Sequence, residues 1–310
     1  MQVVNGHRNA PAWDGAALAI GNFDGVHVGH RALVARAREL AEASGALTVA
    51  LTFDPHPSVL LAPAQAPRML TSIERRVELL AEAGVDAVVV EPFTRELAAV
   101  PPRAFIDDIA IRALRARAII IGYNFRYGQA RAGTVESLRD HGHQAGIAIA
   151  IVPPVTVDGQ IAASTKVRGH LLAGELAAAE RMLGRRWDVD GVVVHGAERG
   201  RAIGIPTANI APDIELAVAP GIYAVTLSVD RGPALPAVAS LGTNPTFVDD
   251  GRLVLEVHVL DWSGDLYDRR VRTTFVARLR DELKFDSVDA LLAQIRRDID
   301  QARAALAPAP

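Results

Sequence analysis

The chain has 310 residues, half of them hydrophobic and 22% charged, and this length predicts two domains with buried cores. A net charge of −3 gives no overall positive field, so we expect no nucleic-acid partner. The absence of cysteine excludes disulfides and thiolate metal sites and fits a reducing compartment. The first residues lack the apolar core of a secretion signal, and no apolar run approaches the roughly 18 residues that span a membrane. We therefore expect a cytoplasmic protein with no membrane partner.

The most informative stretch lies near the N-terminus and reads LAIGNFDGVHVGHRALV. Its apolar start, Leu18–Ile20, predicts a buried strand, and a helix is expected to follow His30. Gly21 and Gly25 allow backbone N–H groups to approach a ligand beside the positive end of the helix dipole. His27 and His30 are three residues apart, so both rings can face one side and stabilise charge that develops on a phosphoryl group. The stretch therefore predicts a nucleotide-phosphate site.

A plainer interpretation is a strand–turn–helix of any α/β protein, with incidental histidines. The whole string GNFDGVHVGH, placed directly after an apolar strand, favours the functional interpretation. It resembles the nucleotidyltransferase signature GxFDGxHxGH, whose histidine pair also occurs in class I aminoacyl-tRNA synthetases. The small size of the chain and its lack of positive charge disfavour a synthetase.

Strand and helix patterns alternate as far as residue 152. Apolar runs suited to buried strands are followed by segments whose apolar residues recur at helical spacing. This alternation predicts a Rossmann-like, doubly wound parallel sheet. After the first strand, the predicted strands cover 46–53, 87–90, 118–122 and 147–152, and the predicted helices cover 31–44, 72–83, 103–114 and 135–145.

Two loops after predicted strands carry polar residues. The segment TFDPHP holds His56 between two prolines, which favours extended backbone, and a stiff strand exit explains it as well as a site does. The loop at 123–133, YNFRYGQARAG, follows another apolar strand, where ligands bind in open parallel sheets. Its arginines and glycines suit an anion, although an ordinary surface loop has the same composition.

The segment Ser164-Thr165-Lys166-Val167-Arg168 precedes an apolar helix predicted over 169–183. Ser164 or Thr165 can cap that helix. The same hydroxyls, with the Lys166 and Arg168 cations, also suit the phosphates of a bound nucleotide. The two interpretations are compatible, because a capped helix start is itself an anion site.

From Trp187 onward the pattern changes to short alternating strands separated by glycine and proline. This spacing predicts an antiparallel β-barrel, so we divide the chain into domains at 1–186 and 187–310. A terminal helix is predicted over 288–306. The predicted barrel strands cover 190–195, 221–229, 234–241, 253–260 and 266–277.

The start of this second domain carries a glycine–arginine loop and the segment PTAN. Gly196, Arg199 and Gly200 form a plausible phosphate-facing loop, although a hairpin turn with solvated charges is the commoner explanation. Thr207 and Asn209 offer two neutral oxygens of the kind that Mg²⁺ accepts beside substrate phosphates. Proline and asparagine are equally common in turns, so a simple turn remains an alternative.

Glu256 lies in the alternating segment RLVLEVHVL. Alternation places Leu255 and Val257 on one face and Glu256 with His258 on the other. By periodicity alone, Glu256 is an exposed charge on the outside of a barrel.

Taken together, the two halves resemble the prokaryotic bifunctional riboflavin kinase/FAD synthetase family, from about Leu18 to Asp298. The N-terminal motifs are GNFDGVHVGH, TFDPHP, GYNFRYGQARAG and ASTKVR. The C-terminal motifs are GAERGRAIGIPTAN, PGIYAV, GTNPTF, LEVHVLDWSGDLYD and LRDELKFDS. Each motif is moderately specific, and the ordered series is highly specific.

The resemblance implies that the first module joins FMN to the AMP part of ATP and releases pyrophosphate. His27 and His30 would stabilise the transition state at the α-phosphoryl group, while Asn124 and Arg126 would line the flavin cleft. The implied nucleotide-binding residues are Gly21, Phe23, Asp24, Gly25, Ser164, Thr165 and Arg168, with the last three on the pyrophosphate.

For the second module the resemblance implies riboflavin kinase, with Mg²⁺ and ATP as co-substrate and no tightly bound prosthetic group. Glu256 would be the general base for the ribityl 5′-hydroxyl, and Arg280 would lie near the flavin. The implied phosphate and metal residues are Gly196, Arg199 and Gly200 in a covering loop, and Thr207 and Asn209 on the metal–nucleotide.

Three departures from the family pattern are present: Asn124 stands where Asp is frequent, Ala163 where Ser is common, and Asp268 where Gly is usual. None removes a residue assigned to chemistry. One alternative is a single-activity riboflavin kinase with a non-catalytic, flavin- or nucleotide-binding N-terminal domain. Another is a flavin or nucleotide sensor without turnover. A nucleotidyltransferase for another acceptor would leave the barrel half without a purpose.

Overall fold

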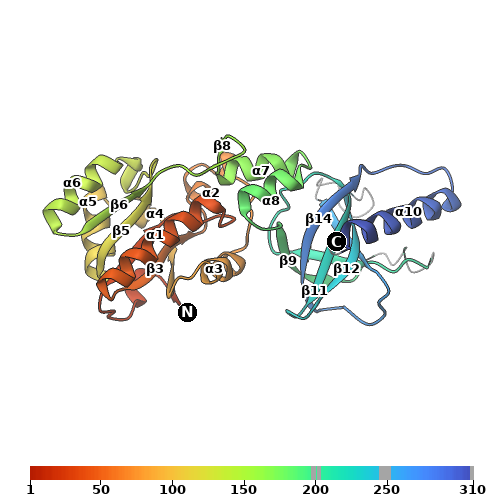
Figure 1. Cartoon of the computed structure of the whole chain (residues 1–310), viewed down its shortest axis with the longest axis horizontal. Helices are drawn as coiled ribbons and strands as arrows, with labels where there is room; N and C mark the ends of the chain where they lie inside the picture. The colour runs from red at the N-terminus through yellow and green to blue at the C-terminus, as the bar shows by residue number, and fades with distance from the viewer. Residues whose placement is uncertain (197–199, 201–203, 244–252, 308–310) are drawn as a thin grey trace. The chain divides into compact units, whose positions relative to one another are not determined.

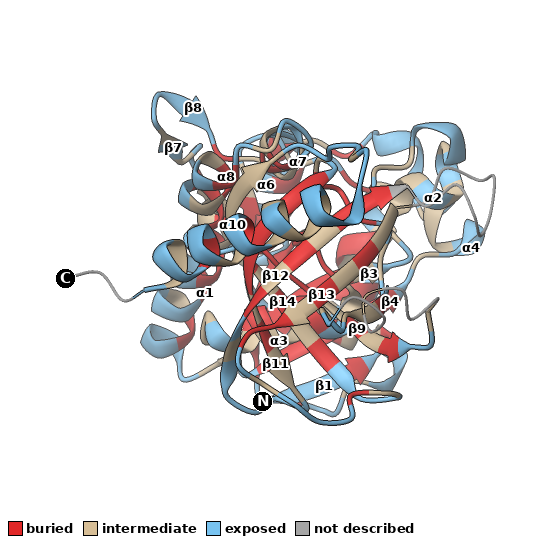
Figure 2. Cartoon of the chain, turned by 90° about the vertical axis from the view of Figure 1, so that its right-hand side faces the viewer, coloured by how far each residue is buried: buried red, intermediate tan, exposed pale blue. Residues whose placement is uncertain are grey.

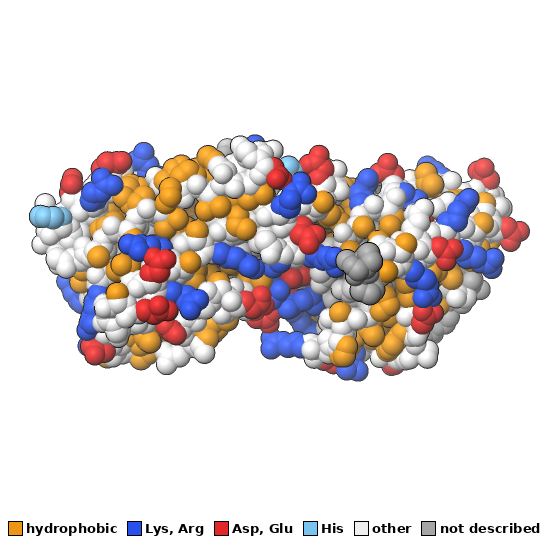
Figure 3. Space-filling view, viewed as in Figure 1, with side chains coloured by type: hydrophobic (Ala, Val, Ile, Leu, Met, Phe, Trp, Pro, Cys, Tyr) orange, Lys and Arg blue, Asp and Glu red, His pale blue; other side chains and the backbone are white. Residues whose placement is uncertain are grey.

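The computed structural model describes residues 1–307 except 197–199, 201–203 and 244–252. These residues form two compact units, one of residues 1–67 and 73–163 and the other of 68–72 and 164–310 (Figure 1). Acidic and basic side chains are interspersed over the face in Figure 3, as the small net charge predicts.

The first unit is built on a six-stranded parallel sheet of order β1-β4-β3-β2-β5-β6. The central strand β2 is buried along its whole length, as its apolar run predicts. The doubly wound parallel sheet expected from the sequence is thus confirmed. The strands are β1 (Gln2–Asn5), β2 (Ala16–Ile20), β3 (Leu47–Asp54), β4 (Ala87–Pro92), β5 (Ala116–Gly122) and β6 (Ala148–Val152).

Helices cover both faces of this sheet. On one face, Ala17 and Ala19 of β2 pack in a core with residues of α1 and α3. On the other face, Leu18 and Ile20 pack in a core with residues of η3 and α6. Figure 1 shows α1 lying in front of β3 and β5. These covering elements are α1 (Val28–Ser44), α3 (Ile73–Glu82), the π-helical segment η3 (Phe105–Ala113) and α6 (Val135–Ala145).

The strand order reverses at β2, which pairs with β3 on one side and β5 on the other. In parallel sheets ligands bind beyond the carboxyl ends of the strands at such a point. The loops after β2 and β5 both begin there. The smaller elements of this unit are η1 (His7–Asn9), α2 (Pro57–Leu61), η2 (Pro63–Gln65), α4 (Arg95–Ala98), α5 (Pro102–Ala104), η4 (Gln129–Arg131), β7 (Thr156–Val157) and β8 (Gln160–Ile161).

The second unit is a closed barrel of order β10-β13-β12-β11-β14-β9, all antiparallel. Along β12 and β13 buried and less buried residues alternate (Figure 2), because successive side chains point into and out of the barrel. The predicted barrel and terminal helix are confirmed. The elements are α7 (Ser164–Leu172), α8 (Leu176–Leu183), β9 (Asp188–Val194), β10 (Ala208–Pro212), β11 (Gly221–Val229), β12 (Ala234–Thr243), β13 (Leu253–Val259), β14 (Arg270–Arg280) and α10 (Val288–Leu306).

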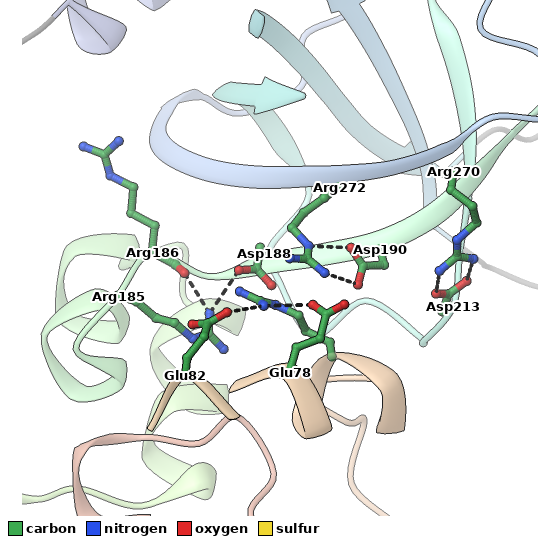
Figure 4. Close-up of polar contacts among 10 residues, drawn as sticks. Glu78, Glu82, Arg185, Arg186, Asp188, Asp190, Asp213, Arg270 and Arg272 are labelled. Atoms are coloured by element: carbon green, nitrogen blue, oxygen red, sulfur yellow. Dashed lines mark hydrogen bonds and ion pairs between the residues drawn. The ribbon is translucent and has the colours of Figure 1, made fainter. Parts of the chain in front are cut away.

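Ion pairs cross the outer surface of the barrel where β14 begins (Figure 4). The guanidinium of Arg272 donates to both carboxylate oxygens of Asp190, at 2.6 and 2.8 Å, directly across the β14–β9 ladder. Arg270 makes a second two-bonded contact with Asp213, at 2.8 and 2.6 Å. Two parallel hydrogen bonds in an arginine–carboxylate pair fix the relative orientation of the two side chains and also strengthen the ion pair.

The main elements differ from the sequence-based prediction as follows. Strands β1 and β10 were not predicted. The single helix expected over 169–183 is two helices, α7 and α8, because Gly174 between them has a φ of 76°. Strand β14 starts at Arg270 and not at Leu266, since Asp268 has a φ of 59° in the preceding turn.

Candidate functional sites

A strained turn links β2 to α1 in the parallel sheet. Phe23, Gly25 and Val26 have positive φ values of 51°, 79° and 41°. Positive φ is costly for residues other than glycine, above all for β-branched valine, and such strain is concentrated at functional sites. Phe23 and Asp24 are buried, so the turn is held from inside the unit. The predicted nucleotide-binding residues of this motif therefore share one preformed turn.

The two histidines meet where this turn enters α1. His27 is the N-cap of the helix, and its Nδ1 accepts from the backbone N–H of His30 at 3.4 Å. Because Nδ1 is the acceptor, the ring proton of His27 belongs on Nε2. The rings of His27 and His30 are stacked, with centroids 3.7 Å apart. The structure thus brings together the pair that the sequence predicted.

Burial sets the charge of this pair. It lowers the pKa of His27 to about 4. The pKa of His30 is also well below its usual value, first because its ring is enclosed and then because His27 and Arg76 lie nearby. Both rings are therefore neutral at pH 7, and neutral imidazoles can donate N–H groups without repelling each other.

Gly29 leaves room for the first histidine ring. A Cβ atom at position 29 would lie 3.0 Å from Cε1 and 3.1 Å from Nδ1 of His27. Real Cβ atoms rarely come so close, so a larger residue would push the ring out of its stack. The glycine of the HxGH motif thus has a packing reason.

A pocket of about 500 Å³ opens at the same edge of the sheet. It draws on the loops after β2, β3, β4 and β5, and Gly21, Asn124 and Arg126 are among its lining residues. Aromatic rings form much of its wall, and two of them, Phe125 and Tyr127, are stacked with centroids 5.5 Å apart. An apolar, aromatic cleft with a few polar groups suits a planar ring system that carries a charged tail.

The predicted pyrophosphate-binding residues lie at the start of the second unit. Ser164 and Thr165 occupy the first turn of α7 and do not precede it as caps. Arg168 follows one turn later, and its Nε donates to the carbonyl oxygen of Arg68 at 2.6 Å. Hydroxyls at a helix start and a nearby arginine suit an anion.

In the barrel, strand register assembles the second site. Asn209 of β10 and Ser240 of β12 are the direct cross-strand neighbours of Glu256 on β13. Directly opposite residues project to the same face of a sheet. The hydroxyl of Thr207, just before β10, is 3.5 Å from the Glu256 carboxylate, at the outer limit of a hydrogen bond. Three predicted residues therefore converge on one patch.

The predicted glycine loop reaches the same patch. A Cβ atom at Gly196 would lie 2.1 Å from the side-chain nitrogen of Asn209. At Gly200 it would lie 2.2 Å from the carbonyl oxygen of Ile205 and 3.4 Å from the Thr207 hydroxyl. Only glycine allows this approach of backbone to the metal-binding candidates. Arg199 lies outside the described residues.

A pocket of about 520 Å³ adjoins Thr207 on the barrel. Val193, Val257 and Tyr267 are among its lining residues, so its wall is largely apolar. Tyr267 is itself stacked on His195, with ring centroids 3.9 Å apart. An apolar pocket lined by one candidate metal ligand, Thr207, suits a base or another planar ring.

Arg280, predicted near the flavin, is engaged within the barrel unit. Its Nε and Nη2 donate to the carboxylate of Asp298 at 2.9 and 2.7 Å, and Asp298 is almost fully buried in α10. Its Nη1 donates to the Asp281 carbonyl, and the guanidinium lies 5.9 Å from the ring centroid of Phe285. Arg280 thus joins β14 to the terminal helix.

Sequence reasoning missed Arg76, a buried arginine of α3 whose charge acts on His30. Two adjacent arginines in an amphipathic helix ordinarily indicate solvated charge, and nothing local singles out the second. It also left His56 as part of a strand exit, whereas His56 Nε2 lies 3.0 Å from the side-chain nitrogen of Asn22. Only the three-dimensional placement of β3 beside β2 reveals that contact.

Comparisons with known proteins identify the family of each half of the chain. The family model for FAD synthetase matches residues 9–166, and that for riboflavin kinase matches 183–306. A bifunctional riboflavin kinase/FMN adenylyltransferase of Pseudomonas fluorescens is 38% identical over 99% of both chains. One of Escherichia coli K12 is 39% identical over 96% of both. The chain belongs to the bifunctional riboflavin kinase/FMN adenylyltransferase family.

As a member of this family, the chain is an enzyme with a riboflavin kinase domain and an FMN adenylyltransferase domain. The prediction from the ordered motifs is confirmed, and the single-activity alternative is not favoured. A crystal structure described as a macrolide-efflux protein from Streptococcus pneumoniae also matches, with a TM-score of 0.86 and 30% identity over 98% of this chain and 99% of that one. In the described part of our chain, no helix is long and apolar enough to cross a membrane.

Proposed function

We propose that the stacked histidine pair carries adenylyl transfer and that the Thr207–Asn209–Glu256 patch carries riboflavin phosphorylation. The observation that supports this division most directly is that the stacked histidine pair lies within the first compact unit, whereas Thr207, Asn209 and Glu256 lie together in the second. The first unit would convert FMN to FAD, and the second would convert riboflavin to FMN. The two reactions are successive, since the product of the second unit is the substrate of the first.

In adenylyl transfer, a phosphate oxygen of FMN would attack the α-phosphorus of ATP, and the bond to pyrophosphate would break. His27 and His30, as neutral donors at the start of α1, would stabilise the charge on the α-phosphoryl oxygens. The reaction needs no covalent enzyme intermediate, so positioning and charge stabilisation would supply the catalysis.

The other contacts proposed for this half rest on the family resemblance. The strained turn with Gly21, Phe23, Asp24 and Gly25 would surround the nucleotide. The aromatic pocket would take the flavin ring, with Asn124 and Arg126 at its polar edge. The residues proposed for the leaving pyrophosphate are Ser164, Thr165 and Arg168.

In riboflavin phosphorylation, Glu256 would accept the proton of the ribityl 5′-hydroxyl as that oxygen attacks the γ-phosphorus of ATP, and the bond from the γ-phosphorus to ADP would break. The Thr207 and Asn209 oxygens are hard ligands that fit Mg²⁺, and they lie beside the glycines proposed to approach phosphate, Gly196 and Gly200. When bound, Mg²⁺ supplies charge stabilisation to the phosphates. Arg199 of the same loop is proposed as a phosphate contact.

Arg280 is proposed to act near the flavin through its neighbours, since its own guanidinium is held by Asp298. We keep the functional boundary of the two halves near residue 186, with α7 and α8 belonging functionally to adenylyl transfer. We also propose a cytoplasmic location, because ATP is a substrate and the chain has no cysteine.

The test is a time course of the purified protein with riboflavin, ATP and Mg²⁺, with the flavins separated by chromatography. FMN should rise first, and FAD should follow. FMN alone would contradict the role given to the histidine pair and would direct attention to Asn124 and Ala163. Bound riboflavin without product would contradict the assignment of both sites.

A further inference from the structure

Arg76 is buried in the first unit beside the histidine pair, with only 2% of its surface exposed. It projects from α3, a helix whose next arginine toward the N-terminus, Arg75, is paired with the carboxylates of Glu78 and Glu82 at 3.1 and 2.9 Å. In the described part of the chain, by contrast, Arg76 has no carboxylate within ion-pair distance. A buried cation without a close counterion is costly, so its presence calls for an explanation.

The guanidinium of Arg76 is tied to the end of β3. Its Nη1 donates to the hydroxyl of Thr52 at 3.3 Å and to the carbonyl oxygen of Phe53 at 3.1 Å. Thr52, itself fully buried, donates in turn to the carbonyl oxygen of Asn22 at 3.0 Å. The Asn22 amide then lies 3.0 Å from His56 Nε2. A continuous chain of hydrogen bonds therefore runs from the cation to the turn after β2.

Among the described residues, the other groups around Arg76 leave its guanidinium protonated and give it no close counterion. Its Nε is enclosed and has no hydrogen-bond partner. Burial lowers the pKa of the guanidinium, and the more distant carboxylates of Asp24, Asp54 and Glu74 offset only part of that effect. Arginine stays protonated even so, and in a low-dielectric site a fixed cation exerts a strong field.

That field reaches the reacting groups. Burial lowers the pKa of His30 most, and the positive charges of Arg76 on α3 and of His27, when protonated, lower it further. Arg76 therefore acts on the site both by geometry and by charge.

We propose that Arg76 is a positioning residue for adenylyl transfer: through the Thr52 hydroxyl it holds the nucleotide-binding turn, and its fixed charge acts on the histidine pair. This inference rests on the role proposed for His27 and His30. The proposal gives α3 a role in adenylyl transfer, although this helix lies outside the sequence motifs that follow β2, β3 and β5.

The first test compares Arg76→Met, Arg76→Lys and Arg75→Met in the full-length protein. We expect Arg76→Met to lower kcat for FAD formation roughly 10²-fold, the scale of a misplaced reacting group, with little change in the KM for ATP. Arg75→Met makes the same charge change on the same helix and should leave that kcat within a few-fold. Hydrogen-exchange protection of β2 and α1 reports whether the first unit of each variant is folded, and riboflavin phosphorylation by the same samples reports on the other unit.

Thr52 separates the two parts of the proposal. Thr52→Val removes the hydroxyl but keeps the side-chain volume. FAD formation should therefore slow by roughly 10-fold, which corresponds to the loss of about one hydrogen bond. Thr52→Ser should restore the rate. Histidine ring titrations by nuclear magnetic resonance should show the pKa of His30 rising toward its usual value in Arg76→Met. They should show it unchanged in Thr52→Val, because the cation remains.

A wild-type kcat in Arg76→Met would overturn the proposal. So would a raised KM for ATP with unchanged kcat, which would make Arg76 a ground-state ligand. If Arg76→Met is unstable, two other results decide. An equally large loss of FAD formation in Arg76→Lys, together with a wild-type rate in Thr52→Val, would show that Arg76 only packs in the core. Failure of the wild-type protein to form FAD would contradict the proposed function instead.

Discussion

In the parallel sheet the proposed reacting groups lie on one turn and one helix start, whereas in the barrel they lie on neighbouring strands. The histidine pair is enclosed, stacked and neutral because burial dominates its surroundings. Glu256 and Asn209 sit partly exposed on the outside of the barrel and meet because of strand register. In the first unit a strained, packed turn positions the side chains of the site. In the barrel the pairing of neighbouring strands, set by the buried residues between them, does so.

The sharpest test of this division is Glu256→Ala. Loss of the proposed general base should slow riboflavin phosphorylation by about 10²–10⁴-fold, whereas FAD should still form from supplied FMN. Assays with each substrate separately measure the two rates in one sample. Loss of both activities in a folded protein would show that the sites are not independent.

The reciprocal change is His30→Ala. Removing one donor to the transferred phosphoryl group should lower FAD formation about 10²–10³-fold, with FMN formation unchanged. FMN should then accumulate from riboflavin. A variant that still made FAD at the normal rate would remove the histidine pair from the chemistry.

The neutral histidines should also make the first unit more sensitive to acid than the barrel. The folded pKa of His27 is about 4, below its unfolded value near 6.5, so the unfolded state binds more protons between these values. Stability should therefore fall as the pH drops through this window, by about 2 kcal/mol between pH 7 and pH 5 for this group.

Hydrogen-exchange protection factors of β2 and α1 measure this loss of stability. His27→Gln, which does not titrate, should flatten the dependence. His30 changes in the same direction, so part of the slope should remain in that variant. A slope unaltered by the substitution would contradict the burial of a neutral His27.

The smallest effect is expected for Gly29→Ala, which tests packing without removing a reacting group. Its Cβ would press on the His27 ring, so FAD formation should slow by roughly 10-fold while phosphorylation stays constant. Gly169→Ala is the matched control, since nothing lies within 4 Å of a Cβ there. Equal rates in the two variants would mean that the stacked ring tolerates displacement.

The doubly wound parallel sheet and the barrel follow from patterns that the sequence contains, whereas the role proposed for Glu256 came from the family resemblance. Apolar strands, helical spacing and the motif order were enough to place His27, His30 and the doubly wound unit. Strand β10 was missed because Pro206 and Asn209 are typical of turns, and only pairing with β9 and β13 makes the segment extended.

Arg76 was beyond sequence reasoning for a different reason. It and Arg75 are chemically identical neighbours on one helix, and both are largely buried. Their difference lies in their partners, carboxylates of the same helix for Arg75 and the end of β3 for Arg76. Contacts between segments far apart in the chain decide which arginine belongs to a site.

The cross-strand pairing of Glu256 with Asn209 has a consequence for how the barrel tolerates change. Leu255 and Val257, on either side of the glutamate, are buried in the barrel. Their burial determines that Glu256 points to the same face of the sheet as Asn209. An insertion of one residue in β13 ahead of Glu256 would turn this residue inward and bring a valine or leucine to the face that carries the proposed kinase site. We therefore expect only insertions or deletions of an even number of residues in this strand to be compatible with kinase activity, because they keep Glu256 on the outer face.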